Sequence, residues 1–208
     1  MALLSLIMRV LTAAAIALCL VMPAQAGNDI IGLDGQPIVS GLYGFDDAAE
    51  AKLLDLMKPI APFVAAGAPN TTTINQIGTD LFAHAAVEGS SNLTLIQQSG
   101  SNNRAVQAVA GNQTALLLQQ SGSNNSTLQL SVGNDNFQLL GVSGQNNDVA
   151  YIQAGNELAG ALKVGGENAS VLALQTDASH KYLMPVGLNG LKNQVVVIVP
   201  GRMYVFKK

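Results

Sequence analysis

Apolar and polar residues recur along the middle of the chain with a fixed period of eleven. Within each period they alternate with the spacing of two that is typical of a β-strand. A glycine closes every period, without an insertion. These glycines are Gly78, Gly89, Gly100, Gly111, Gly122, Gly133, Gly144, Gly155 and Gly166. The pattern predicts strands of about 5–6 residues, joined by tight turns at glycine, which adopts backbone angles that other residues avoid.

An 11-residue period can also indicate a right-handed helical supercoil. Regular glycine argues against helices, because each interior glycine costs a helix about 1 kcal/mol relative to alanine. The periods also alternate in type, since Gln76, Gln98 and Gln120 lie two residues before their glycines. The intervening periods have Val87, Val109 and Ser131 at that position. We therefore predict an all-β fold, a β-solenoid (β-helix) of 22-residue rungs over residues 70–179, with equivalent strands stacked at about 4.7–4.9 Å.

Neutral amides recur on one phase of the predicted strands. Stacked Gln or Asn side chains can bond from rung to rung as ladders, whereas stacked charges would repel one another. We expect these amides to hold the rungs together and to mediate assembly. They are Gln76, Gln98, Asn103, Gln120, Asn125, Asn147, Gln153 and Gln175.

The opposite phase carries an apolar column, five residues before the glycines. If the amides face inward, this column lies on an outer face and forms an interaction surface. The alternative, in which inside and outside are exchanged, remains open from the sequence. The column contains Leu95, Val106, Leu117, Leu128, Leu139, Ala150, Ala161 and Leu172.

The stretch "QQSGSNN" occurs twice, at residues 97–103 and 119–125. Its Gln-x-Gly-x-x-Asn core resembles the curlin repeat, and the resemblance extends over about residues 70–179. It implies a subunit of curli, the extracellular amyloid fibres that bacteria use in biofilms and adhesion. Such subunits leave through a dedicated outer-membrane pore and polymerise with other curlin subunits on a minor, nucleating subunit. Val142 replaces Gln in the third unit, and Leu81 replaces Asn in the first, so the choice between major and minor subunit stays open.

Residues 1–26 have the layout of a secretory signal peptide. Arg9 precedes an apolar stretch over residues 10–22, and "AQA" at 24–26 predicts cleavage after Ala26. The only cysteine, Cys19, lies in this segment, so the mature chain has no disulfide. We expect export through the periplasm to the cell surface. A membrane anchor is the alternative, although the apolar run is shorter than the about 20 residues that a span requires.

The two flanks of the repeats carry opposite charge. Residues 27–69 form an acidic segment, in which "DDAAEAKLLDLMK" (46–58) predicts a short helix and "APFVAAGAPN" (61–70) a linker. This segment is either a secretion or docking element or a cap over the first rung. Residues 180–208 are basic, and "NQVVVIVP" and "RMYVFKK" predict a hairpin or terminal rung around Pro200 and Gly201.

The basic C-terminal side chains are candidates for contact with an anionic surface, such as the outer membrane or an acidic part of another subunit. Edge protection is the alternative, because Lys on a terminal strand discourages further strand pairing. A basic final segment also resembles the nucleating curli subunit. The residues are Lys181, Lys192, Arg202, Lys207 and Lys208.

The composition indicates a structural protein and not an enzyme. Only 11% of the 208 residues are charged, against roughly a quarter in ordinary globular domains. His84 and His180 are the only histidines, without a pattern that predicts a metal site, cofactor or catalytic group. A net charge of −3 argues against nucleic-acid binding. The remaining alternatives are a monomeric capped solenoid that acts as an adhesin or binding module and, less favoured, a solenoid polysaccharide-degrading enzyme.

Overall fold

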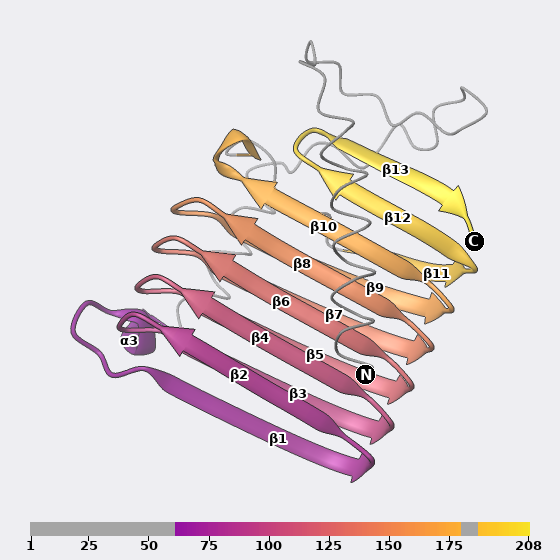
Figure 1. Cartoon of the computed structure of the whole chain (residues 1–208), viewed down its shortest axis with the longest axis horizontal. Helices are drawn as coiled ribbons and strands as arrows, with labels where there is room; N and C mark the ends of the chain where they lie inside the picture. Colours follow the sequence, from indigo (N-terminus) through magenta and orange to yellow (C-terminus); the bar gives the residue numbers. More distant parts are fainter. Residues whose placement is uncertain (1–60, 180–186) are drawn as a thin grey trace.

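The computed structural model describes residues 61–179 and 187–208, which form a flattened β-solenoid of two facing sheets (Figure 1). The predicted all-β solenoid is thereby confirmed. The first sheet has the order β1 (Thr71–Thr79), β3 (Leu93–Ser101), β5 (Ala115–Ser123), β7 (Phe137–Gln145), β9 (Ala159–Glu167) and β11 (Leu188–Lys192). The second contains β2 (Phe82–Glu88), β4 (Arg104–Ala110), β6 (Ser126–Val132), β8 (Asp148–Ala154), β10 (Ser170–Thr176), β12 (Gln194–Val199) and β13 (Arg202–Lys207).

Consecutive rungs stack in parallel and in register at the 22-residue interval. Gln98 pairs with Gln120 in the first sheet, and Val106 pairs with Leu128 in the second. The strands are longer than the sequence predicts, with nine residues in β3 and seven in β4. The reason is that β3 continues through Gly100 to Ser101, so the glycine bends the strand before the turn proper.

A left-handed residue two positions after each glycine completes the turn. Gly100 has φ +110°, and a Cβ added there would lie 2.0 Å from the carbonyl oxygen of Gly122. Only glycine fits, because the backbone angle and the close rung above both exclude a side chain. The left-handed residues recur every eleven positions with φ of 52–58°. They are Asp80, Ser91, Asn102, Gln113, Asn124, Asp135, Asn146, Glu157 and Asn168.

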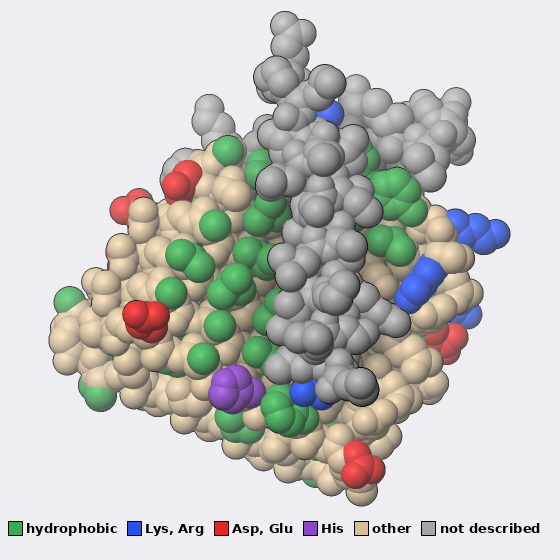
Figure 2. Space-filling model, in the orientation of Figure 1, with side chains coloured by type: hydrophobic (Ala, Val, Ile, Leu, Met, Phe, Trp, Pro, Cys, Tyr) green, Lys and Arg blue, Asp and Glu red, His purple; other side chains and the backbone are tan. Residues whose placement is uncertain are grey.

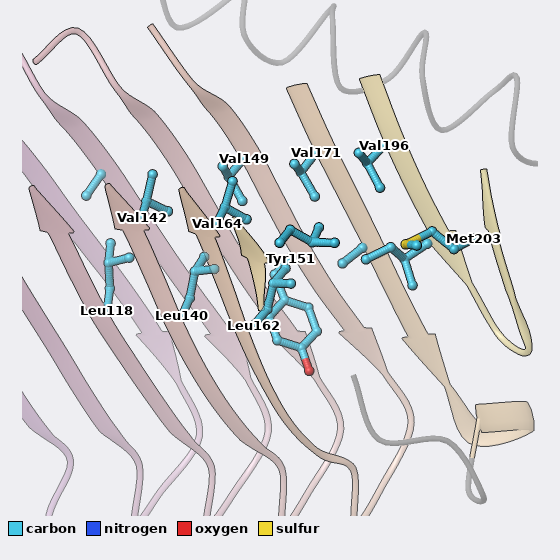
Figure 3. Close-up of a cluster of buried hydrophobic side chains, with 14 of the residues drawn as sticks. Leu118, Leu140, Val142, Val149, Tyr151, Leu162, Val164, Val171, Val196 and Met203 are labelled. Atoms are coloured by element: carbon cyan, nitrogen blue, oxygen red, sulfur yellow. The ribbon is translucent and has the colours of Figure 1, made fainter. Parts of the chain in front are cut away.

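The space between the sheets is filled by aliphatic columns. Leu118, Leu140 and Leu162 follow one another up the first sheet, and Val149 and Val171 face them from the second (Figure 3). Each of these side chains is almost wholly buried. The stack therefore has a continuous core, to which every rung contributes the same positions.

Tyr151 is the largest side chain in this core and is fully buried. Its Oη donates to Gln175 Oε1 at 2.8 Å. Burial removes water from the phenol and raises the pKa of Tyr151 far above its ordinary value. The hydroxyl therefore remains a neutral donor within the core.

The apolar residues that lie five positions before the glycines point outward. They form two columns, one on each sheet. Leu95 and Leu117 lie on the outer face of the first sheet, whereas Val106 and Leu128 lie on the outer face of the second. Figure 2 shows hydrophobic side chains gathered over the second sheet. On the first sheet a further cluster forms outside the core. It contains Leu93, Ala115, Phe137 and Ala161, with Val64 packed against it.

Helical structure among the described residues is limited to two short segments. These are α3 (Ala61–Val64) and the 3-10 turn η1 (Asp177–Ser179). The segment that the sequence predicts as a linker thus contains a turn of helix before β1. The predicted helix at 46–58, the acidic residues before it and the signal peptide over residues 1–26 lie outside the described residues.

The C-terminal segment forms the predicted hairpin. β12 pairs in parallel with β10, and β13 then pairs antiparallel with β12 through the turn at Pro200 and Gly201. β11 continues the first sheet with a register irregularity between Leu188 and Leu191. The C-terminal end of the stack therefore differs in strand direction and in regularity from the rungs before it.

Candidate assembly interface

Three of the predicted glutamines form a ladder inside the first sheet. Nε2 of Gln76 donates to Oε1 of Gln98 at 2.7 Å, and Nε2 of Gln98 donates to Oε1 of Gln120 at 2.7 Å. Gln98 and Gln120 are 3% and 1% exposed, whereas Gln76 in the first rung is exposed. The ladder ends at Val142, which stacks on Gln120. At the other end of the ladder, the amide of Gln76 is in contact with solvent and can bond to another rung.

The same amides also hold the turn between the sheets. Nε2 of Gln120 donates to the carbonyl oxygen of Asn125 at 2.9 Å and to Oγ1 of Thr127 at 3.0 Å. The carbonyl oxygen of Asn125 also accepts the backbone N–H of Arg104 at 2.8 Å. A hydrocarbon side chain in place of Gln120 would therefore remove one of its two donors, together with the hydrogen bond to Oγ1 of Thr127. The ladder position therefore stabilises both the stack and the turn.

Gln153 and Gln175 form a second ladder at the other corner of the solenoid, in β8 and β10. Nε2 of Gln153 donates to Oε1 of Gln175 at 2.8 Å. Nε2 of Gln175 donates to the carbonyl oxygen of Ala159 at 2.9 Å. The two sets of predicted glutamines thus do not form one ladder, because one occupies the N-terminal rungs of the first sheet and the other the C-terminal rungs of the second.

The predicted asparagines lie together at one corner and bond mainly to backbone. Oδ1 of Asn103 accepts the backbone N–H of Asn125 at 3.0 Å, and Oδ1 of Asn125 accepts that of Asn147 at 3.1 Å. Nδ2 of Asn125 donates to the carbonyl oxygen of Gly144 at 2.9 Å and to Oδ1 of Asn103 at 3.1 Å. The side chains of Asn125 and Asn147 therefore bond to the rungs on both sides, whereas that of Asn103 bonds to its own rung and the next.

Further ladders occur that the candidate set does not contain. Gln107 and Gln129 are fully buried in the second sheet, and Nε2 of Gln107 donates to Oε1 of Gln129 at 2.7 Å. On the surface, Nδ2 of Asn102 donates to Oδ1 of Asn124 at 2.6 Å. In the sequence, both pairs can be recognised as an amide that recurs after 22 residues. Gln107 and Gln129, however, lie in a column whose other residues are apolar.

The described residues leave the N-terminal edge of the stack open. Among the described strands, β1 and β2 each have a neighbour on one side only. Ile74 is 42% exposed, whereas Ile96, at the same position in the next rung, is 0% exposed. Thr72 is likewise exposed, whereas Thr94 is buried. The described part of the 27–69 segment, residues 61–69, thus leaves the first rung uncovered, and the rest lies outside the described residues.

The basic candidates lie at the opposite end of the stack. Lys192, Arg202, Lys207 and Lys208 are exposed, and Lys181 lies outside the described residues. Figure 2 shows Lys and Arg side chains at the side where the C-terminus lies. Nζ of Lys208 donates to Oδ1 of Asn168 at 3.0 Å and to Oγ of Ser170 at 3.2 Å, so this cation fixes the end of the hairpin to the stack.

Metal-ligating side chains do not come together in the part of the chain that the structure describes. No three His, Cys, Asp or Glu side chains gather there in a way that could hold a metal ion. His84 is exposed on the outer face in register with Val106, and His180 lies outside the described residues. No helix within these residues is long and apolar enough to cross a membrane.

Comparisons with known proteins leave the family open. No family model matches the chain, and neither a curated protein nor a solved structure matches it significantly.

Proposed function

We propose that this chain is a secreted structural subunit of curli-like extracellular amyloid fibres, which serve biofilm cohesion and adhesion. The observation that carries the proposal is the open N-terminal edge. There an in-register stack of parallel rungs ends in exposed strands and in the exposed Gln76, the first member of the glutamine ladder. Assembly then extends the same rung-on-rung contacts from one subunit to the next.

The physical basis is that an edge strand presents alternate N–H and C=O groups to solvent. A further rung would satisfy these groups and cover Ile74, whose counterpart Ile96 is already fully buried. Full burial of one aliphatic side chain contributes about 1.5–3 kcal/mol. The in-register glutamines would extend their ladder at the same time, as in cross-β assemblies.

Export and partners are part of the same proposal and rest on the sequence. Residues 1–26 would direct the chain to the general secretory route, and a curli-type outer-membrane pore would release it. Other curlin subunits would be its partners in the fibre. The basic C-terminal residues would contact an anionic surface such as the outer membrane.

Fibre formation by residues 27–208 tests the proposal. The purified protein is incubated alone and, in a second arm, is added at low ratio to a fibre-forming curlin-repeat subunit. In the first arm we expect fibres that bind thioflavin and diffract at about 4.7–4.8 and 10 Å. In the second arm we expect a shorter lag before thioflavin fluorescence rises. Either result would support the proposal. A protein that stays monomeric in the first arm and leaves the lag unchanged in the second would contradict the proposal.

The antiparallel C-terminal hairpin supports one alternative function. A solenoid closed at this end could act as a monomeric adhesin or binding module, displaying its outer faces to a receptor or glycan. The negative result in both arms of the fibre assay would favour this alternative.

A further inference from the structure

The two ends of the stack differ in strand direction, in regularity and in the charge of their edge strands, which are features that control strand addition. At the N-terminal end, β1 contains no charged residue, and both strands of the first rung run parallel to their neighbours. Exposed edges of this kind are templates for another strand. The inward positions of this rung, Ile74 and Gln76 among them, are uncharged.

The C-terminal end carries several devices that block further pairing. β13 runs antiparallel to the rest of its sheet, and β11 is irregular between Leu188 and Leu191. Lys207 shares the inward phase of β13 with Met203 and Val205, because side chains alternate along a strand. An inward-pointing charge, a reversed strand and an irregular edge each discourage the addition of a parallel rung.

The side chains at this end also fail to match those at the other end. Leu188 of β11 stacks on Val164, in the column that Gln76 begins. If a second copy placed its C-terminal end on the first rung, Leu188 would lie where the ladder requires an amide. Gln76 would then be buried against a hydrocarbon, with one side of its amide unsatisfied, which is unfavourable.

We propose that the chain is an end subunit with a single templating surface, the β1–β2 edge, which accepts a rung of a different subunit. The partner is a strand–turn–strand unit of the same 22-residue period, with Gln or Asn opposite Gln76 and an aliphatic residue opposite Ile74. This inference rests on the proposed function. It explains how one chain can combine an unprotected edge with a blocked one.

Peptide binding to the full chain, residues 27–208, tests the inference. The probe is a fluorescein-labelled synthetic peptide of residues 92–113, which is one complete rung and carries Gln98. Binding is measured by fluorescence anisotropy, and the bound edge is located by hydrogen exchange. The inference predicts new amide protection over residues 71–88, with none gained over residues 188–207. A matched peptide with Gln98→Leu should bind about tenfold more weakly, because it offers Gln76 no amide.

Two protein variants distinguish the ends. Ile74→Lys places a charge inward at the open edge and should abolish binding, whereas Val205→Lys at the C-terminal edge should leave it unchanged. Hydrogen-exchange protection in β5 to β8 verifies that each variant retains the stack. Gln76→Leu is a milder second variant, and it should remove the preference for the peptide with Gln98. Protection over residues 188–207, wild-type binding by Ile74→Lys, or no binding of the peptide would each overturn the inference.

The inference and the proposed function can fail separately. Long fibres of the chain alone would support the proposed function and overturn the single templating surface. The same conclusion would follow if the Ile74→Lys variant still seeded another subunit and the Val205→Lys variant did not. Seeding would then support the proposed function, but the templating surface would be the C-terminal end and not the β1–β2 edge. Absence of both self-assembly and seeding would contradict the proposed function itself.

Discussion

Replacement of Gln120 by Glu is a sharp test of the buried ladder. The two side chains have nearly the same shape, so Gln120→Glu changes charge and hydrogen bonding without changing volume. Gln120 is 1% exposed, and its Nε2 donates to the carbonyl oxygen of Asn125 at 2.9 Å. A carboxylate at this place would face an acceptor in a site without water, and both effects disfavour the charged form.

The destabilisation should therefore depend on pH. Burial raises the pKa of the introduced carboxyl in the folded state above the ordinary value of about 4.3 in the unfolded chain. Below that value both states are protonated, and the variant loses only the amide donor, at a cost of about 1–3 kcal/mol. Above it, stability falls by about 1.4 kcal/mol per pH unit until the folded-state pKa is reached. At pH 7 the additional loss is at most about 3–4 kcal/mol.

The neighbouring residue provides the matched control. Gln119 precedes Gln120 in the same strand, but its side chain points outward and is exposed. Gln119→Glu introduces the same charge and should change the free energy of unfolding by less than about 0.5 kcal/mol. Urea unfolding of monomeric protein, followed by circular dichroism at pH 4 and pH 7, measures both variants. Equal losses for the two variants at pH 7 would refute a buried, uncharged ladder.

Two further predictions concern the turns and the core. Gly122→Ala should destabilise the fold by about 3 kcal/mol, because φ is +102° and the new Cβ would lie 2.0 Å from the carbonyl oxygen of Gly144. Gly141→Ala is the control, because φ there is not left-handed and the new Cβ would make only an ordinary contact with Cγ of Lys163 at 3.6 Å. Similar melting temperatures for the two variants would contradict the close stacking. Tyr151→Phe should cost about 1 kcal/mol through loss of the bond to Gln175 Oε1. In the wild type, ultraviolet titration should show this phenol ionising only far above the ordinary tyrosine range, because burial raises its pKa; ionisation near pH 10 without unfolding would contradict its burial.

Much of the repeat fold follows from local chemistry and was predictable. Glycine at intervals of eleven fixes where the backbone bends, and the alternation of Gln98 with Val109 two residues before the glycine fixes the rung at 22 residues. The hairpin at Pro200 and Gly201 is equally local. Strand length was underestimated because the glycine lies before the turn and not at its centre. The left-handed residue, such as Asn102, completes the turn.

The candidate site was predictable in composition but not in arrangement. Glutamines at the same place in the repeat appear in the sequence as one group, yet Gln120 and Gln153 belong to different ladders at different corners. The period identifies equivalent positions, but it does not show where a ladder ends. Gln107 was not among the expected ladder residues, because its column is otherwise apolar. Its Nε2 donates to Gln129 and also to the backbone carbonyl oxygens of Leu95 and Leu116, which are contacts that only the folded chain provides.

The rung, the turns and the in-register pairing are predictable from the amino-acid sequence, because they depend on residue spacing and on backbone angles within one period. Which phase faces inward required the tertiary structure, since both phases contain apolar residues and only the facing sheet decides which of them is buried. The inequality of the two ends is likewise tertiary. The turn at Gly201 predicts a hairpin, but only the strand order shows that β13 ends the second sheet as its antiparallel edge, while β1 and β2 end the stack as parallel edges. That reversal, together with the exposed first rung, separates an open end from a blocked one.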